Sequence, residues 1–246
     1  VMSVSPDIIS TIIELQNLPS LQNFYLGGGT NLALRYNHRE SVDIDLFTED
    51  KIGINGFENI EREINAHFSK RILFINYPTK QNDDLVFIRA VIKTNDTDIK
   101  IEIIQNFKLM FDIEIIQNLR LARELDIALF KMESLCNRYA EKDLYDLDYI
   151  TDKTNSSIDK LFKLYSNKKV IILKDNIKTI FNMDDSSICP IENPELLIIE
   201  NSTKKNIPFH SESKILNPAS SYQVSKYKWR HKVNTYIRNN ITTKKP

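Results

Sequence analysis

The feature that most constrains this chain is a run of three glycines followed closely by two aspartates. Gly27, Gly28 and Gly29 are three of only five glycines in 246 residues, and Asp43 and Asp45 follow within an apolar run. Glycine allows a backbone to approach another group closely. Aspartates two apart on a strand point from the same face, where their carboxylates repel unless a cation lies between them. The pattern predicts a site for a metal-bound nucleoside triphosphate.

The ligands that this site would offer can be assigned from their chemistry. Carboxylate oxygens suit Mg²⁺, or Mn²⁺, and leave coordination positions open for phosphates. The backbone N–H groups of Gly28, Gly29 and Thr30 would lie at a helix N-terminus, which attracts anions. We therefore expect Asp43 and Asp45 to hold the metal and the glycines to hold the phosphates of the triphosphate.

The glycine–aspartate segment, read in full, and a second segment downstream together resemble a known family. The first stretch reads Tyr25-Leu-Gly-Gly-Gly-Thr-Asn-Leu-Ala-Leu-Arg35, His38-Arg39, Ser41 and Asp43-Ile-Asp-Leu-Phe47. Downstream, the second consists of Lys131, Arg138 and Lys142-Asp143-Leu-Tyr-Asp146-Leu147. Together, over roughly residues 20 to 150, they resemble the AbiEii/AbiGii toxins, which belong to the nucleotidyltransferase superfold of the DNA polymerase beta type.

The resemblance implies an activity, a substrate and partners. We expect magnesium-dependent transfer of a nucleoside monophosphate from a nucleoside triphosphate to an acceptor, with RNA such as a tRNA 3′ end as that acceptor. The implied role is that of the toxin in a bacterial toxin–antitoxin or abortive-infection system, with a cognate antitoxin as partner. The alternative is a catalytically silent family member that binds nucleotide or RNA and acts through binding.

A third carboxylate on a neighbouring strand is implied by the same resemblance. Glu102 lies within the apolar segment 99–104 and would share a strand face with Lys100. The resemblance gives this position metal binding and proton abstraction from the attacking hydroxyl. Asp98 is the alternative for that role, and an exposed structural glutamate is the other interpretation of Glu102.

The downstream residues receive nucleotide-binding roles by resemblance. Lys131 and Arg138 are two helical turns apart, on a face away from the apolar stripe of their helix. Lys131 would bind the triphosphate as a catalytic residue, with Arg138 in support. Asp143 and Asp146 would orient Lys131, contact nucleotide, or only cap their own helix. Arg39 is close enough to the glycines in sequence to contact a phosphate.

Residue periodicity predicts an α+β protein in which a mixed β-sheet flanked by helices precedes a mainly helical region. We expect an α/β core over residues 1–120, a helical region over 121–200 and a basic, aromatic-containing tail over 201–246. Strands are predicted at 24–26, 42–47, 72–77, 85–92 and 99–104, with Thr30 capping the helix after the glycines.

The charge distribution is asymmetric, although the net charge is zero. Residues 201–246 contain eight lysines and two arginines against the single Glu212, and the aromatic residues Tyr222, Tyr227, Trp229 and Tyr236 lie among these basic residues. Such a segment attracts nucleic acid. Alternatively, it folds back on the acidic body or remains a solvated terminus.

The remaining composition indicates a cytoplasmic protein. No apolar run reaches the roughly 20 residues that a membrane span needs, and no signal peptide is expected at the N-terminus. Cys136 and Cys189 lie far apart in different contexts, which favours reduced thiols.

Overall fold

The computed structural model describes residues 2–95, 97–138, 140–181, 189–198, 214–216 and 221–240. The chain divides into two compact units. The first comprises residues 1–123 and 172–185, and the second comprises residues 124–171 and 186–246. The chain therefore leaves the first unit, enters the second, and returns to the first for a short segment.

The first unit is built on a seven-stranded mixed sheet with the order β3-β4-β5-β2-β1-β7-β6. Strand β2 runs parallel to β5, and β1 runs parallel to β7; the remaining neighbours are antiparallel. The strands are β1 (Tyr25–Leu26), β2 (Ile44–Phe47), β3 (Ile72–Lys80), β4 (Val86–Lys93), β5 (Asp98–Ile104), β6 (Glu114–Ile116) and β7 (Leu119–Leu121).

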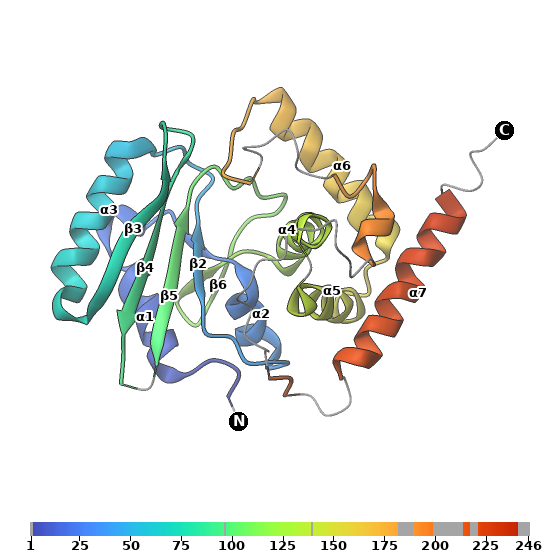
Figure 1. Ribbon diagram of the computed structural model, residues 1–246, viewed down its shortest axis with the longest axis horizontal. Coiled ribbons are helices and arrows are strands. Elements are labelled where there is room, and N and C mark those ends of the chain that lie inside the picture. Colours follow the sequence, from blue (N-terminus) through green and yellow to red (C-terminus); the bar gives the residue numbers. More distant parts are fainter. Residues whose placement is uncertain are drawn as a thin grey trace. The chain divides into compact units, whose positions relative to one another are not determined.

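Three helices accompany this sheet: α1 (Pro6–Gln16), α2 (Gly28–Tyr36) and α3 (Gly53–Phe68). Helix α1 begins with a side-chain cap, in which Ser5 Oγ accepts a hydrogen bond from the Ile8 N–H, and Pro6 occupies its first turn. Figure 1 shows α3 running along β3 and β4, and it contacts both strands.

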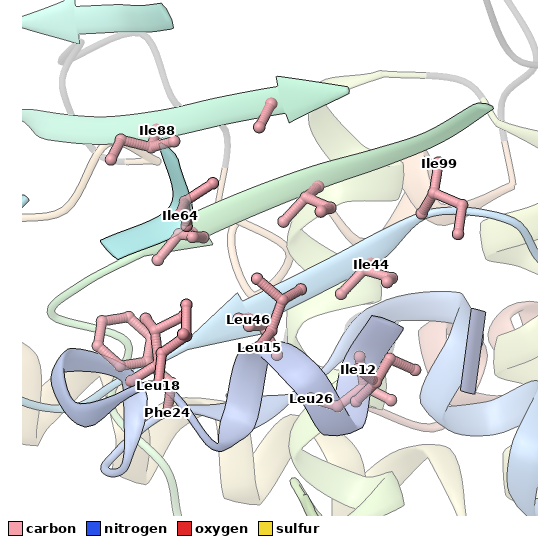
Figure 2. Packing of buried hydrophobic residues seen from close by; sticks show 14 of the residues in the cluster. Ile12, Leu15, Leu18, Phe24, Leu26, Ile44, Leu46, Ile64, Ile88 and Ile99 are labelled. Atoms are coloured by element: carbon pink, nitrogen blue, oxygen red, sulfur yellow. The ribbon is translucent and has the colours of Figure 1, made fainter. Parts of the chain in front are cut away.

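One face of the sheet forms the main hydrophobic core. Ile99, Ile101 and Ile103 alternate along β5 and are fully buried, as are Ile44 and Leu46 of β2. Figure 2 shows the β2 pair above Ile12 and Leu15 of α1, and the same cluster includes Ile60 and Ile64 of α3. Because strand side chains alternate, this packing directs the even-numbered residues of β5 and the odd-numbered residues of β2 to the opposite face.

The second unit is helical. It contains α4 (Glu124–Asn137), α5 (Glu141–Lys153), most of α6 (Ile158–Lys174) and α7 (Tyr222–Asn240). Helix α5 packs against both α4 and α7. None of the helices in the described ranges combines the length and the apolar character needed to cross a bilayer.

The α+β architecture with a helical C-terminal region is confirmed, but three local features differ from expectation. Strands β6 and β7 are too short for their periodicity to be recognised. Thr30 does not cap α2, because the helix begins two residues earlier at Gly28 and Gly27 is the cap. Residues 222–240, expected in a tail, form α7, which packs back on α5 as the fold-back alternative describes.

Candidate active site

The register between β2 and β5 brings carboxylates together on the face opposite the core. Asp45 is directly paired with Glu102 across the parallel strands, and Asp43 precedes β2 by one residue. Asp43, Asp45 and Glu102 are all half-buried, whereas the intervening Ile44 is fully buried. Asp98 begins β5 four residues before Glu102, or roughly 13 Å along the strand. Glu102, and not Asp98, is therefore the residue opposite Asp45.

The glycine run packs directly against this pair of strands. The Gly27 N–H donates a hydrogen bond of 2.9 Å to the Asp45 carbonyl. Gly28 has a φ of +62°, and a Cβ atom there would lie 2.1 Å from Asp45 Oδ2. Only glycine satisfies both conditions. The first turn of α2 is thus held beside the Asp45 carboxylate, and no side chain caps this helix N-terminus.

Thr30 and Arg39 complete the immediate surroundings of the loop. The Thr30 hydroxyl donates to the Asp43 carbonyl and lies 2.9 Å from Ser41 Oγ, so it ties α2 to the start of β2. Arg39 is only 2% exposed, and its Nη2 occupies the place where a side chain at Gly29 would project. Its Nη1 donates to the Glu40 carbonyl at 3.0 Å. Arg39 therefore lies against the predicted phosphate loop.

Gly28→Ala provides a test of this close approach, and Gly53→Ala is its matched control. Both glycines have a left-handed φ, +62° and +65°, and both would place a Cβ within 3 Å of an aspartate oxygen, that of Asp45 or Asp83. We expect similar losses of about 1–2 kcal/mol in unfolding free energy from the backbone strain. Only Gly28→Ala should also weaken Mn²⁺ binding, measured by electron paramagnetic resonance. Equal Mn²⁺ affinity in the two variants would contradict the packing described here.

Two cations share the face with the three carboxylates. Arg89 of β4 is register-paired with Glu102, and its Nε and Nη2 lie 2.8 and 2.7 Å from Glu102 Oε1. Lys100 Nζ lies 3.7 Å from Asp43 Oδ2 and 3.6 Å from Glu102 Oε2. Burial lowers the pKa of Lys100, but the three neighbouring carboxylates raise it more, so that the pKa lies above its ordinary value. Lys100 is therefore positively charged at neutral pH.

These contacts decide how the cluster suits a divalent ion. Among the residues that the structure describes, no group of three or more metal-ligating side chains stands close enough to hold an ion. Asp43 and Asp45 share a face and have the oxygen chemistry that Mg²⁺ prefers. Glu102 Oε1 is already hydrogen-bonded to Arg89. By their chemistry, Asp43 and Asp45 would therefore suit a single divalent ion.

A second charged cluster lies within the helical unit. Lys131 Nζ of α4 is 2.7 Å from Asp143 Oδ1 and 2.8 Å from Asp146 Oδ2, both on α5. Arg138 Nη2 lies 3.2 Å from Asp143 Oδ2. Burial raises the pKa of Asp143, but Lys131 and Arg138 lower it more, and the net pKa lies below the ordinary value.

Burial distinguishes the interpretations that the sequence leaves open for this cluster. Lys131 is only 4% exposed, so it is not part of a solvated face away from the helix packing. The cap residue of α5 is Ala140, whose side chain cannot accept a hydrogen bond, and Asp143 and Asp146 instead hold Lys131 in place. These ion pairs fix the position of the Lys131 ammonium relative to the two carboxylates.

Sequence reasoning assigned no role to Arg89 or Lys100 in the strand cluster. The available signal for Arg89 is that it is the single charged residue inside the apolar strand segment 86–92.

A glycine loop opening a helix beside paired strand carboxylates, on a mixed sheet followed by helices, defines a nucleotidyltransferase-type protein. The chain matches the family described as nucleotidyl transferase AbiEii toxin of type IV toxin–antitoxin systems over residues 14–174. It belongs to that family. The chain is thus a nucleotidyltransferase, and the family implies a nucleoside triphosphate substrate and an antitoxin partner.

One sequence relative and two solved structures are similar to the chain, and the solved structures show that the fold is shared. An uncharacterised protein of Aquifex aeolicus is 32% identical over 155 residues, which cover 63% of this chain and 70% of the relative. The nucleotidyltransferase toxin MenT4 of Mycobacterium tuberculosis has a TM-score of 0.55 at 15% identity, covering 92% of this chain and 81% of MenT4. JHP933 of Helicobacter pylori has a TM-score of 0.52 at 16% identity, covering 96% and 92%.

Proposed function

We propose that this chain transfers a nucleoside monophosphate from a nucleoside triphosphate to RNA, such as a tRNA 3′ end, in a magnesium-dependent reaction. The observation that carries the proposal is the contact of Gly28 with the Asp45 side chain. It sets the start of α2 beside the carboxylates, so phosphates held by the Gly28, Gly29 and Thr30 N–H groups would lie next to the metal ligands. The transferase would act in the cytoplasm as the toxin of a toxin–antitoxin pair of the abortive-infection type.

Each residue of the first cluster has a defined role in this proposal. Asp43 and Asp45 would hold Mg²⁺, which would supply positive charge to the phosphate oxygens. Arg39, packed behind Gly29, would fix the loop and add positive charge near the phosphates. Lys100 would offset the mutual repulsion of the carboxylates.

Of the two carboxylate oxygens of Glu102, Oε1 accepts a hydrogen bond from Arg89 and Oε2 lies 3.6 Å from Lys100 Nζ. As a metal ligand or general base it would act through Oε2, because Oε1 accepts the Arg89 hydrogen bonds. Arg89 would thus position Glu102 beside Asp45, its register partner.

In the second cluster, Lys131 would bind the triphosphate with Arg138 in support, as the family resemblance implies. Asp143 and Asp146 would fix the Lys131 ammonium in place. Catalysis in such transferases depends on positioning and charge neutralisation, so a lysine held by two carboxylates suits this role.

The proposal is tested by incubating the full chain with each labelled nucleoside triphosphate, Mg²⁺ and total bacterial RNA. Label entering RNA with the wild-type chain, and not with the Asp45→Asn variant, supports RNA as the acceptor and identifies the nucleotide. Label entering only protein or a small molecule contradicts the RNA acceptor. Triphosphate binding without any transfer would instead support the catalytically silent alternative.

Arg89→Met should tighten Mn²⁺ binding by roughly fivefold, because removing a partly exposed charge is worth about 1 kcal/mol. The Arg89 side chain is 40% exposed and neutralises a carboxylate beside the metal ligands. Arg62→Met, which removes an exposed arginine on α3, is the control and should leave Mn²⁺ affinity unchanged. Weaker Mn²⁺ binding by Arg89→Met would show that Glu102 must be held by Arg89 in order to support the ion.

A further inference from the structure

Strand β3 is an edge strand of the sheet and carries an exposed aromatic residue. Figure 1 shows β3, β4, β5 and β2 side by side, with β3 outermost. Phe74 on β3 is 46% exposed, and Asn76 is also exposed. Neither side chain makes a hydrogen bond or a ring contact with another residue that the structure describes. A single exposed apolar residue is ordinary on a protein surface, so its position relative to the candidate active site decides whether it matters.

The register of the strands places Asn76 on the face that carries the candidate active site. Asn76 is paired with Arg89 of β4, which is paired with Glu102 of β5. Glu102 is in turn paired with Asp45 of β2. Because directly paired residues point to the same face of a sheet, one row of side chains runs from Asn76 to a predicted metal ligand. Three strand spacings, or roughly 14 Å, separate the two ends of this row.

A second row beside the first contains Phe74. Phe74 is paired with Val91 of β4, and Val91 with Lys100 of β5. Lys100 Nζ lies 3.7 Å from Asp43 Oδ2, so this row also leads to a predicted metal ligand. Ile75, between Phe74 and Asn76, instead packs against the hydrophobic core, as strand alternation requires. The two rows therefore form one continuous surface from the carboxylates to the edge strand.

The chemistry of this surface changes along the two rows. Carboxylates lie at one end, and an aromatic ring and a neutral amide lie at the other. Between them, the Arg89 and Lys100 side chains are 40% and 39% exposed, although both pair with carboxylates. A polynucleotide presents matching groups in the same order, namely a terminal hydroxyl, phosphates and bases. Aromatic rings on an exposed sheet face are a recurring surface on which unpaired RNA bases stack.

We propose that Phe74 and Asn76, together called the edge platform, bind a base near the 3′ end of a single-stranded RNA acceptor. The proposal rests on the proposed RNA acceptor and assigns it residues that determine specificity. The Phe74 ring stacks on the base, and the Asn76 amide, which has both a donor and an acceptor, hydrogen-bonds to the base edge. A protein acceptor would bring a hydroxyl to the carboxylates equally well, but it has no phosphates to lie beside Arg89 and Lys100.

The first test is binding of a short single-stranded RNA with a free 3′ hydroxyl to the full chain with Mg²⁺ and without triphosphate, measured by fluorescence anisotropy. Phe74→Ala should bind this RNA about tenfold more weakly, as expected for the loss of one stacked base. The slope of log K against log salt should stay unchanged, because the ring carries no charge. Phe74→Trp should keep the affinity. Wild-type affinity in Phe74→Ala would overturn the proposal.

The matched control for Phe74→Ala is Ile115→Ala, which removes a 71% exposed side chain from β6 at the other edge of the same sheet. This control should bind RNA like the wild type, and an equal loss in both variants would overturn the proposal. Phe74→Ala should also retain the wild-type Mn²⁺ affinity, because Phe74 is separated from the carboxylates by two strands. Circular dichroism checks that both variants fold.

Asn76 is tested by base preference. RNAs that differ in a single base close to the 3′ end are compared, and the wild type should discriminate between bases at one of these positions. Asn76→Ala should reduce that discrimination about tenfold, because it removes a paired donor and acceptor. Asn65→Ala, which alters an exposed asparagine on α3, should leave it unchanged. Equal discrimination by Asn76→Ala and the wild type would contradict the assigned role of Asn76.

Photocrosslinking locates the contact directly. RNA with thiouridine near its 3′ end should crosslink to the peptide of residues 72–80, which trypsin releases by cleaving after Arg71 and Lys80. Crosslinks that occur only in other peptides would overturn the proposal.

Failure of this proposal is distinguishable from failure of the proposed function. Phe74→Ala should raise the KM for RNA and leave kcat largely unchanged, whereas Asp45→Asn should abolish transfer. If the wild type transfers label to RNA and Phe74→Ala does so with an unchanged KM, the proposed function stands and the edge platform fails. If label enters only protein or a small molecule, the RNA acceptor fails and the edge platform fails with it.

Discussion

Replacing either Asp43 or Asp45 by asparagine should lower nucleotide transfer by at least about a thousandfold. Positive charge supplied by a bound ion is worth several kcal/mol in such reactions, and each factor of ten corresponds to about 1.4 kcal/mol. Asparagine retains the shape of the side chain but removes the anionic oxygen that attracts the ion. The measurement is incorporation of label from the preferred nucleoside triphosphate, together with Mn²⁺ binding in the absence of nucleotide.

The structure predicts that these variants fold normally, so a loss of transfer would not be caused by unfolding. Thr30 and the Gly27 N–H contact the backbone carbonyls of Asp43 and Asp45, not their side chains. Asp50→Asn, which alters an exposed aspartate beyond β2, is the control and should keep both activity and Mn²⁺ affinity. Transfer near the wild-type rate by Asp45→Asn would rule out the site described here.

The largest effect on stability is expected from Lys131→Met. Asp143 and Asp146 are 2% and 0% exposed and depend on the Lys131 ammonium for charge compensation. Removing one partner from a buried ion pair costs about 3–5 kcal/mol. In a protein of this size each kcal/mol lowers the melting temperature by about 2–4 °C, so a drop of roughly 10 °C is expected by thermal unfolding.

The control for this prediction removes the carboxylates as well. The triple variant Lys131→Met, Asp143→Asn, Asp146→Asn removes the three buried charges of the cluster and alters only one further ion pair, that of the partly exposed Arg138, so it should recover much of the lost stability. Lys163→Met, an exposed lysine on α6, should change the melting temperature little. Unfolding of Lys131→Met at the wild-type temperature would contradict a structural role for the ion pairs of Lys131 with Asp143 and Asp146.

The same cluster predicts a dependence of stability on pH. The native pKa of Asp143 lies below its ordinary value, so the unfolded state binds a proton more readily than the native state. The stabilisation is therefore fully present above the ordinary carboxyl pKa of about 3.9 and is lost as the pH falls through the native pKa. Asp143→Asn should lack this part of the acid destabilisation, which urea unfolding at several pH values would measure.

The sequence predicts the first cluster well because its signals are local. Gly28 and Asp45 lie 17 residues apart, and each belongs to a short motif whose residue types restrict the backbone conformation. The alternation of isoleucines around Glu102 correctly assigns its face. The direct pairing of Glu102 with Asp45 is a property of sheet register between distant strands, so it is not available from either segment alone.

Long-range ion pairs explain what the sequence does not reveal. Arg89 contacts Glu102 across an antiparallel pair, and Lys131 reaches two carboxylates on another helix. Helical spacing predicts that Lys131 and Arg138 lie two turns apart. It does not predict that Lys131 is buried, because burial depends on how α5 packs against α4. Likewise, the basic composition of residues 201–246 leaves open whether they bind nucleic acid or fold back on the protein, whereas the pairs of Lys228 and Lys232 with Asp148 show that α7 packs on α5.

The return of the chain to its first unit has a consequence for how such proteins recombine. Residues 172–185 belong with residues 1–123, and within that unit Asn106 donates to the Lys178 carbonyl while Phe107 contacts the Phe181 ring. A gene fusion with a single crossover at residue 123 would therefore separate the catalytic module from one of its own segments. An exchange of the second unit between relatives would need three crossovers, after residues 123, 171 and 185, so that residues 124–171 and 186–246 are inherited together.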